Sequence, residues 1–321
     1  MTNILKYKQQ HILIAGSKKL AASISVCMLQ AGHRVTIYNP ANADVVSPVN
    51  QHIDDVLRYT GQVVSSEMLS VVTYPDTAEG YDMAIAITNE NVADKIALVH
   101  ELETWLGNNV PIAINMESIK LSALQQYLEN PERLLGANWV EPAHTTCFLE
   151  IITNGHTNQQ IANDFYNLAK DLWNKDPYIL KSDAGIRAKM MCALLREAFY
   201  LIENNYVTVE DVDRACRNDA GYYMSFAGNF RYMDLMGTYM YGVVMQELNP
   251  ELSKNIHIPQ FCQQLINYGS KGMASNQGFY QYEPGEAEMW EATFRKFSYE
   301  IQHIINKYPF NYIPEDTTVK S

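Results

Sequence analysis

The chain has 321 residues, of which 47% are hydrophobic, and this is enough to bury the cores of two domains. Its net charge of −12 disfavours nucleic acid and anionic membranes as partners, because both repel an acidic surface. The five cysteines are odd in number and have no C-x-x-C spacing, which is typical of reduced thiols in a cytoplasmic protein. The start of the chain lacks the apolar core of a signal peptide, and no apolar run reaches the ~18 residues of a membrane span.

The first predicted elements have the pattern of a dinucleotide-binding fold. Residues 11–16 are a short apolar run that ends at a glycine, residues 20–31 repeat apolar side chains at helical spacing, and residues 34–38 are a second apolar run. A strand, a helix and a strand in this order predict a right-handed βαβ unit that opens a parallel sheet.

The loop after the first strand departs from the dinucleotide fingerprint G-x-G-x-x-G/A. It consists of Gly16, Ser17, Lys18, Lys19, Leu20 and Ala21. Gly16 keeps the tight turn and Ala21 is an accepted third position, but Lys18 replaces the glycine that lets a pyrophosphate approach the backbone. Either Lys18 and Lys19 hold a differently placed anion at the helix N-terminus, or the dinucleotide site is weakened or lost. We favour the second interpretation.

Strands and helices continue to alternate after this unit. The predicted elements are a helix over 49–58, strands over 71–74 and 81–88, a helix through 98–106 and a strand over 111–115. A further apolar run begins at Leu134, is broken by a polar bend around Pro142, and resumes at Phe148. Because proline cannot donate to a sheet ladder, we expect Pro142 at a bend or an edge. A polar bend between apolar runs is a natural place for a site, although a solvated turn has the same pattern.

From Thr157 the apolar period becomes helical. We expect Thr157 to cap a helix, residues 178–180 to form the last strand, and residues 183–205 to form a long apolar helix. The predicted fold is therefore α/β, with a Rossmann-type doubly wound sheet over 1–182. An all-α domain over 183–309 and a polar tail over 310–321 follow it.

The bend resembles the signature of the 3-hydroxyacyl-CoA dehydrogenase family, G-x-H-[F/W]-x-N-P-x-H followed by L-V-E-V. The matching residues are Gly136, Trp139, Pro142, His144, Leu149 and Glu150. The family's catalytic histidine falls on Asn138, and the asparagine before the proline falls on Glu141. Weaker agreement extends over nearly the whole chain. The resemblance implies a Rossmann domain that binds NAD, a helical domain through which the family forms dimers, and oxidation of a 3-hydroxyl group.

The resemblance also implies positions for the cofactor. Asn39 stands where the family has the acid that binds the ribose, and an amide forms a weaker hydrogen bond there than a carboxylate. Glu90 and Lys95 match residues on the cofactor side of the cleft, although helix capping alone would also explain Glu90. The candidate cofactor-binding residues are Gly16, Ser17, Lys18, Lys19, Leu20, Asn39, Glu90, Lys95 and Asn115.

Most catalytic positions implied by the resemblance hold other residue types. Asn138 replaces the histidine, and Glu117 replaces the serine that holds the substrate oxygen. The family's catalytic asparagine falls on Ala188 or Lys189. Only Glu150, which matches the glutamate that orients the histidine, is retained. The candidate catalytic residues are Asn138, Glu150, Glu117 and Lys189.

Three hypotheses follow. The one we favour is a pseudoenzyme that binds a small hydroxy acid or an acyl-CoA-like ligand, with NAD binding weak or absent. The second is an active NAD(H)-dependent oxidoreductase with a rearranged site. The third is a cluster of Glu117, Glu141 and Glu150 in which a raised pKa supplies a general acid or base, although solvated loop carboxylates have the same pattern. The apolar helix over 186–202 further predicts a homodimer through the helical domain.

Overall fold

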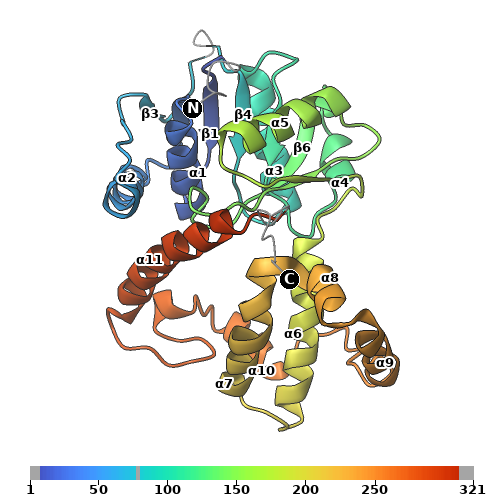
Figure 1. The fold of residues 1–321 in the computed structure, drawn as a ribbon. Helices are drawn as coiled ribbons and strands as arrows, with labels where there is room; N and C mark the ends of the chain where they lie inside the picture. The colour runs from blue at the N-terminus through green and yellow to red at the C-terminus, as the bar shows by residue number, and fades with distance from the viewer. Residues whose placement is uncertain (1–7, 77–79, 311–321) are drawn as a thin grey trace, which may run out of the picture. The chain divides into compact units, whose positions relative to one another are not determined.

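The structure, a computed structural model, describes residues 8–76 and 80–310. The chain divides into two compact units, one ending at Lys189 and the other beginning at Met190, inside helix α6 (Arg187–Glu203; Figure 1). The boundary expected at residue 182 stays a prediction. The tail expected from residue 310 lies almost entirely outside the described residues.

The first unit is built on an eight-stranded sheet with the order β3-β2-β1-β4-β5-β6-β7-β8. Neighbouring strands are parallel except for the pair β6–β7, which is antiparallel. This confirms the Rossmann-type doubly wound sheet. The strands are β1 (His11–Ala15), β2 (Arg34–Tyr38), β3 (Leu69–Val72), β4 (Met83–Ala86), β5 (Ile112–Ile114), β6 (Leu134–Asn138), β7 (Glu150–Ile152) and β8 (Tyr178–Leu180).

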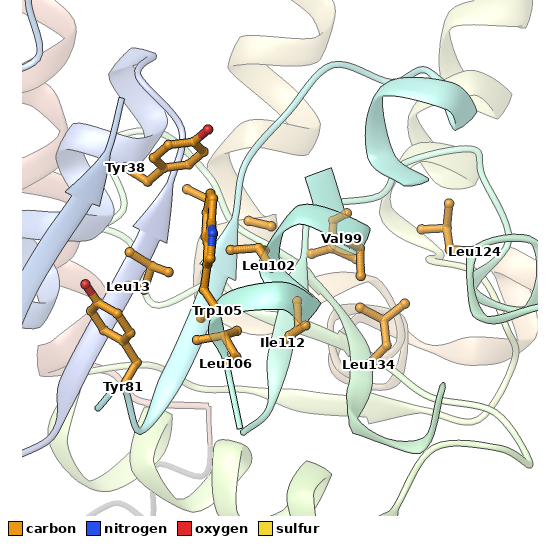
Figure 2. Packing of buried hydrophobic residues seen from close by; sticks show 14 of the residues in the cluster. Leu13, Tyr38, Tyr81, Val99, Leu102, Trp105, Leu106, Ile112, Leu124 and Leu134 are labelled. Atoms are coloured by element: carbon orange, nitrogen blue, oxygen red, sulfur yellow. The ribbon is translucent and has the colours of Figure 1, made fainter. Parts of the chain in front are cut away.

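Helices connect the strands as the alternating pattern predicts. They are α1 (Lys19–Gln30), α2 (Val46–Thr60), α3 (Val92–Trp105), α4 (Leu121–Gln125), a short 3-10 helix (Pro131–Arg133) and α5 (Gln159–Leu172). Side chains of β1, α3, β5 and β6 pack into one apolar cluster, in which Leu13, Leu102 and Leu134 are completely buried (Figure 2). Full burial of such a side chain contributes about 1.5–3 kcal/mol. This packing fixes the carboxyl ends of the central strands, where the candidate residues lie.

The cap of α5 differs from the prediction. Asn158, not Thr157, is the N-cap, and its side chain accepts a hydrogen bond from the backbone N–H of Gln160. The Thr157 hydroxyl is buried and donates to the carbonyl of Leu134 at 3.4 Å. Both residue types cap helices well, so the expectation placed the cap one residue early.

The second unit is helical, as predicted. It contains most of α6, then α7 (Val209–Ala215), a π-helix (Cys216–Ala220), α8 (Gly221–Met236), α9 (Thr238–Leu248), α10 (Gln260–Asn267), a 3-10 helix (Met273–Ser275) and α11 (Glu286–Lys307). A capping box between Thr208 and Asp211 starts α7. Within the part of the chain that the structure describes, no helix is both long and apolar enough to cross a membrane.

Candidate active site

Asn138 and Glu150 face each other across the antiparallel pair of strands. Asn138 ends β6, Glu150 begins β7, and the two residues are direct partners in the ladder. The Nδ2 of Asn138 donates to Oε1 of Glu150 at 2.9 Å, and both side chains are almost completely buried. The structure therefore brings together the two candidates that the bend motif pointed to.

The orientation of the Asn138 amide is fixed by a second hydrogen bond. The backbone N–H of Met116, just after β5, donates to Oδ1 of Asn138 at 2.8 Å. Oδ1 is thus an acceptor for Met116, and Nδ2 is a donor to Glu150. An amide held in this way offers no basic nitrogen to a substrate hydroxyl.

Glu150 receives further donors on its other oxygen. Oε2 accepts from the Tyr178 hydroxyl at 3.0 Å and from the backbone N–H groups of Ile186 and Arg187 at 2.9 and 3.2 Å. Burial, followed by the charge of Glu150 and this hydrogen bond, raises the pKa of Tyr178. Asn138, Tyr178 and the two backbone N–H groups therefore all donate to the buried Glu150 carboxylate. These hydrogen bonds offset the cost of removing the carboxylate from water.

Two glycines make room for this arrangement. A Cβ at Gly185 would overlap Oε1 of Glu150 and would lie 3.1 Å from Nδ2 of Asn138. A Cβ at Gly136 would lie 2.5 Å from the sulfur of Met116. The motif identified Gly136, whereas no local pattern links Gly185 to Glu150, so this contact was not predicted.

Beside these residues, Glu117 forms an ion pair with Arg187 through Nη1. The two side chains are 36% and 37% exposed, and the guanidinium lies 5.8 Å from the centre of the Phe148 ring. Arg187 was not among the predicted residues, because the pair is separated by 70 positions in the sequence. Lys189 is exposed on α6, and within the described ranges it has no hydrogen bond or ion pair with the other candidates.

Glu90 fixes the loop that carries Glu117. Its Oε1 accepts the backbone N–H groups of Glu117, Ser118 and Ile119 at 3.1, 2.8 and 3.0 Å. Burial alone would raise the pKa of Glu90, but these donors and the nearby charge of Lys95 hold it below its usual value. Glu90 is therefore ionised at neutral pH and anchors the loop after β5.

Lys95 and Asn115 extend the network of contacts around Glu90. The Nζ of Lys95 is fully buried, donates to the carbonyl of Asn115 at 2.5 Å, and lies 3.3 Å from Oε2 of Glu90. Burial lowers the pKa of Lys95, and the charge of Glu90 opposes this effect. The Asn115 amide pairs with the backbone of Thr88, donating to its carbonyl at 3.1 Å and accepting from its N–H at 2.9 Å. The three candidates thus support one another and tie β4 to β5.

The loop after β1 lines one side of a cavity at the carboxyl ends of β1, β2 and β4. Gly16 is required there, because a Cβ would lie 2.7 Å from the carbonyl oxygen of Ile87. Lys18 is the N-cap residue of α1, and its Nζ donates to the side chain of Asn89. The cavity has a volume of about 220 Å³ and is lined by Gly16, Ser17, Lys18, Tyr38, Pro40, Ala41, Thr88, Asn89 and Glu101, among others.

The side chain of Asn39 forms hydrogen bonds within its own loop. Its amide donates to the carbonyl of Ala43 at 2.7 Å and accepts the N–H of the same residue at 3.2 Å. Tyr38 and Pro40, its neighbours, line the cavity. The Tyr38 hydroxyl donates to Glu101 at 2.6 Å, and burial together with this contact raises the pKa of Tyr38.

The third carboxylate of the suggested cluster, Glu141, has separate partners. Ser23 donates to its Oε2 at 2.5 Å, and Nε2 of His52 lies 3.5 Å from its Oε1. His144 lies against His52, and burial, with the charges of His52 and Lys175, holds the pKa of His144 well below its usual value. Among residues 8–76 and 80–310, no group of three or more His, Cys, Asp and Glu side chains could hold a metal ion.

Comparison with known proteins identifies the family. Residues 11–183 match the NAD binding domain of 3-hydroxyacyl-CoA dehydrogenase, and residues 186–282 match its C-terminal domain. The chain belongs to the 3-hydroxyacyl-CoA dehydrogenase family. The resemblance carried by the bend motif is therefore confirmed.

Individual members of the family are distant relatives. A 5-formyl-3-hydroxy-2-methylpyridine 4-carboxylate 5-dehydrogenase of Mesorhizobium japonicum is 23% identical over 291 residues, which cover 88% of this chain and 94% of the relative. The human mitochondrial hydroxyacyl-coenzyme A dehydrogenase is 22% identical, over 85% of this chain and 91% of that protein. A crystal structure of such a pyridine carboxylate dehydrogenase, described as an NAD+ dependent dismutase, has a TM-score of 0.85 at 22% identity. It covers 93% of this chain and 99% of that one, which shows a shared fold.

Proposed function

We propose that this member of the 3-hydroxyacyl-CoA dehydrogenase family binds a small acid or an acyl-CoA-like ligand and has lost ordinary NAD-linked hydride transfer. The observation that carries the proposal is the Asn138 amide, held between the Met116 N–H and Glu150. A general base contributes typically ~10²–10⁴-fold to the rate, and this position offers none. NADH-dependent reduction of acetoacetyl-CoA is the direct test.

The neighbouring replacements support the same conclusion. Glu117 stands in the place of a hydroxyl donor, and its carboxylate is paired with Arg187. A carboxylate cannot donate a hydrogen bond to a carbonyl oxygen unless it is protonated. Loss of one oxyanion donor typically costs ~10²-fold or more. Because such residues act as a unit, Asn138→His alone is expected to restore little activity.

Weak or absent NAD binding is part of the proposal. Lys18 replaces the second glycine of the fingerprint, and its side chain reaches Asn89 on the loop after β4. This bridge does not fit a pyrophosphate that must lie against the backbone at the start of α1. No catalytic step is therefore assigned to the dinucleotide.

Lys18→Gly is expected to strengthen NAD binding at least tenfold, because it removes both the side chain and its bridge to Asn89. Calorimetric titration with NAD and NADH measures the change. Lys170→Ala is the matched control, since it removes an exposed lysine of the same unit that does not line the cavity; it is expected to change the affinity little. Micromolar binding by the unmodified protein, about −8 kcal/mol, would contradict this part of the proposal.

The names of the relatives support two ligand classes. The Mesorhizobium relative is named for a pyridine 4-carboxylate, and the human relative is named for a hydroxyacyl-coenzyme A. Both names include an acyl or carboxyl group, as a free acid in one and as a CoA ester in the other. These names support a small acid or an acyl-CoA-like ligand for this chain.

The alternative function is an active NAD(H)-dependent oxidoreductase with a rearranged site. The cavity at the carboxyl ends of β1, β2 and β4, and a dehydrogenase relative matched over 94% of its length, favour it. In that case Glu117 is the candidate proton acceptor, because its carboxylate is about one-third exposed and it follows Met116, whose N–H holds Asn138. Turnover with NADH separates the two functions.

We also propose a homodimer through the second unit. That unit exposes large apolar side chains on α6, where Met190, Met191, Leu194 and Leu195 are 56%, 51%, 51% and 41% exposed. Four exposed large apolar side chains on one helix favour an interface there. Light scattering at micromolar concentration is expected to give a dimer, and Leu194→Lys is expected to shift it towards monomer. A mass of 36.5 kDa for the unmodified protein would contradict the proposal.

A further inference from the structure

The ion pair of Arg187 and Glu117 lies directly beside the Asn138–Glu150 pair. The backbone N–H of Arg187 donates to Glu150, and Glu117 follows Met116, whose N–H holds Asn138. The charged ends of the pair are about one-third exposed, whereas Asn138 and Glu150 are buried. This pair therefore places solvent-accessible charges beside the buried Asn138–Glu150 pair.

Both partners are held in place by other contacts. The backbone of Glu117 is fixed by Glu90, and the backbone of Arg187 is fixed by Glu150. The guanidinium also lies 5.8 Å from the centre of the Phe148 ring. Such anchoring lowers the entropy that a side chain loses when it binds a ligand. The arrangement is a preorganised cationic group rather than a mobile surface side chain.

The chemistry of the guanidinium selects its ligand. Arginine presents several N–H donors in a fixed fork that matches a carboxylate in a bidentate geometry. In the part of the chain that the structure describes, Glu117 is the carboxylate in contact with this group, through Nη1. Nε and Nη2 can therefore still donate to a ligand. A thioester carbonyl is uncharged and has one oxygen, so it cannot form the two parallel hydrogen bonds that a carboxylate forms with a guanidinium. The ionised Glu117 carboxylate has no hydrogen to donate to that oxygen.

We propose that Arg187 is the specificity-determining residue of this site and that it binds the free carboxylate of a small acid. Glu117 holds the guanidinium through Nη1, and the acid binds at Nε and Nη2, where the Glu117 charge lowers its affinity. This inference rests on the proposed ligand-binding function and names its substrate class as carboxylic acids rather than CoA thioesters. It also explains how a chain with a net charge of −12 holds an anion at this position.

The experiment compares ligands that share one carbon skeleton. The full-length protein is titrated calorimetrically with 3-hydroxybutyrate, with its neutral amide and with 3-hydroxybutyryl-CoA. The acid is expected to bind at least tenfold more tightly than the amide. Arg187→Gln is expected to reduce this preference below about threefold, and Arg187→Lys, which keeps the charge but loses the fork, to give an intermediate value. Glu117→Gln is expected to strengthen acid binding several-fold, because it removes a negative charge beside the bound carboxylate.

Lys120→Gln, on the same loop as Glu117, is the control for general electrostatic attraction and is expected to leave the preference unchanged. Equal binding of acid and amide, failure of the acid to bind at millimolar concentration, or a preference that survives Arg187→Gln would overturn the inference. Tighter binding of the CoA ester than of the acid would do so as well. NADH turnover, measured in the same samples, tests the proposed function separately, because it does not depend on the difference between acid and amide.

Discussion

Glu150→Ala is expected to lower the free energy of unfolding by roughly 3 kcal/mol, the largest effect of any single change at the site. The substitution takes the acceptor away from Asn138, Tyr178 and the N–H groups of Ile186 and Arg187. A buried donor without a partner costs about 1–3 kcal/mol, and water can reach only part of the vacated space. Denaturant unfolding followed by fluorescence measures the loss. A change below about 0.5 kcal/mol, which is normal for a surface position, would contradict this reading of Glu150.

An exchange of the two polar groups provides a matched control. Glu150→Gln alone places an NH₂ group opposite the Nδ2 of Asn138, and Asn138→Asp alone places two carboxylates in contact. In the double variant, the new amide donates to the carboxylate introduced at position 138, which still accepts the Met116 N–H. The side-chain oxygen of the glutamine introduced at position 150 accepts from the Tyr178 hydroxyl and from the N–H groups of Ile186 and Arg187. The double variant is therefore expected to be more stable than either single variant, and a double-mutant cycle measures this coupling.

Gly185→Ala is expected to cost about 1–3 kcal/mol, as other substitutions that overfill a packed interior do. The added Cβ would overlap Oε1 of Glu150, which cannot move away without losing its donors. Gly155→Ala is the matched control in the same unit, because nothing lies within 4 Å of a Cβ there. The same unfolding experiment compares the two variants. Equal stability of the two would show that Glu150 adjusts freely.

Much of the first unit was predictable from local pattern. Apolar runs such as 11–15 are buried on both faces, as parallel strands are, and they alternate with helical periods. Pro142 lies in the bend between β6 and β7, as expected from its missing N–H. Asn138 and Glu150 were paired by the family motif, and the antiparallel register makes them neighbours.

The features that were missed depend on contacts between distant parts of the chain. The pairing of Arg187 with Glu117 joins the start of α6 to the loop after β5, and no local pattern links these residues. Lys95 is fully buried, although a lysine on an exposed helix face gives the same sequence pattern. The need for glycine at residue 185 arises from a side chain 35 positions earlier. Such requirements become visible only when the strands are assembled.

The measurement that tests the central claim most directly is NADH-dependent reduction of acetoacetyl-CoA by the native protein. Nicotinamide absorbance is followed at saturating substrate, with the Asn138→His variant beside it. We expect no appreciable turnover by the native protein and little gain in the variant, because Asn138 supplies no base and Glu117 supplies no donor. A turnover of ~1 s⁻¹ or more by the native protein, the low end for ordinary enzymes, would contradict the proposed loss of hydride transfer.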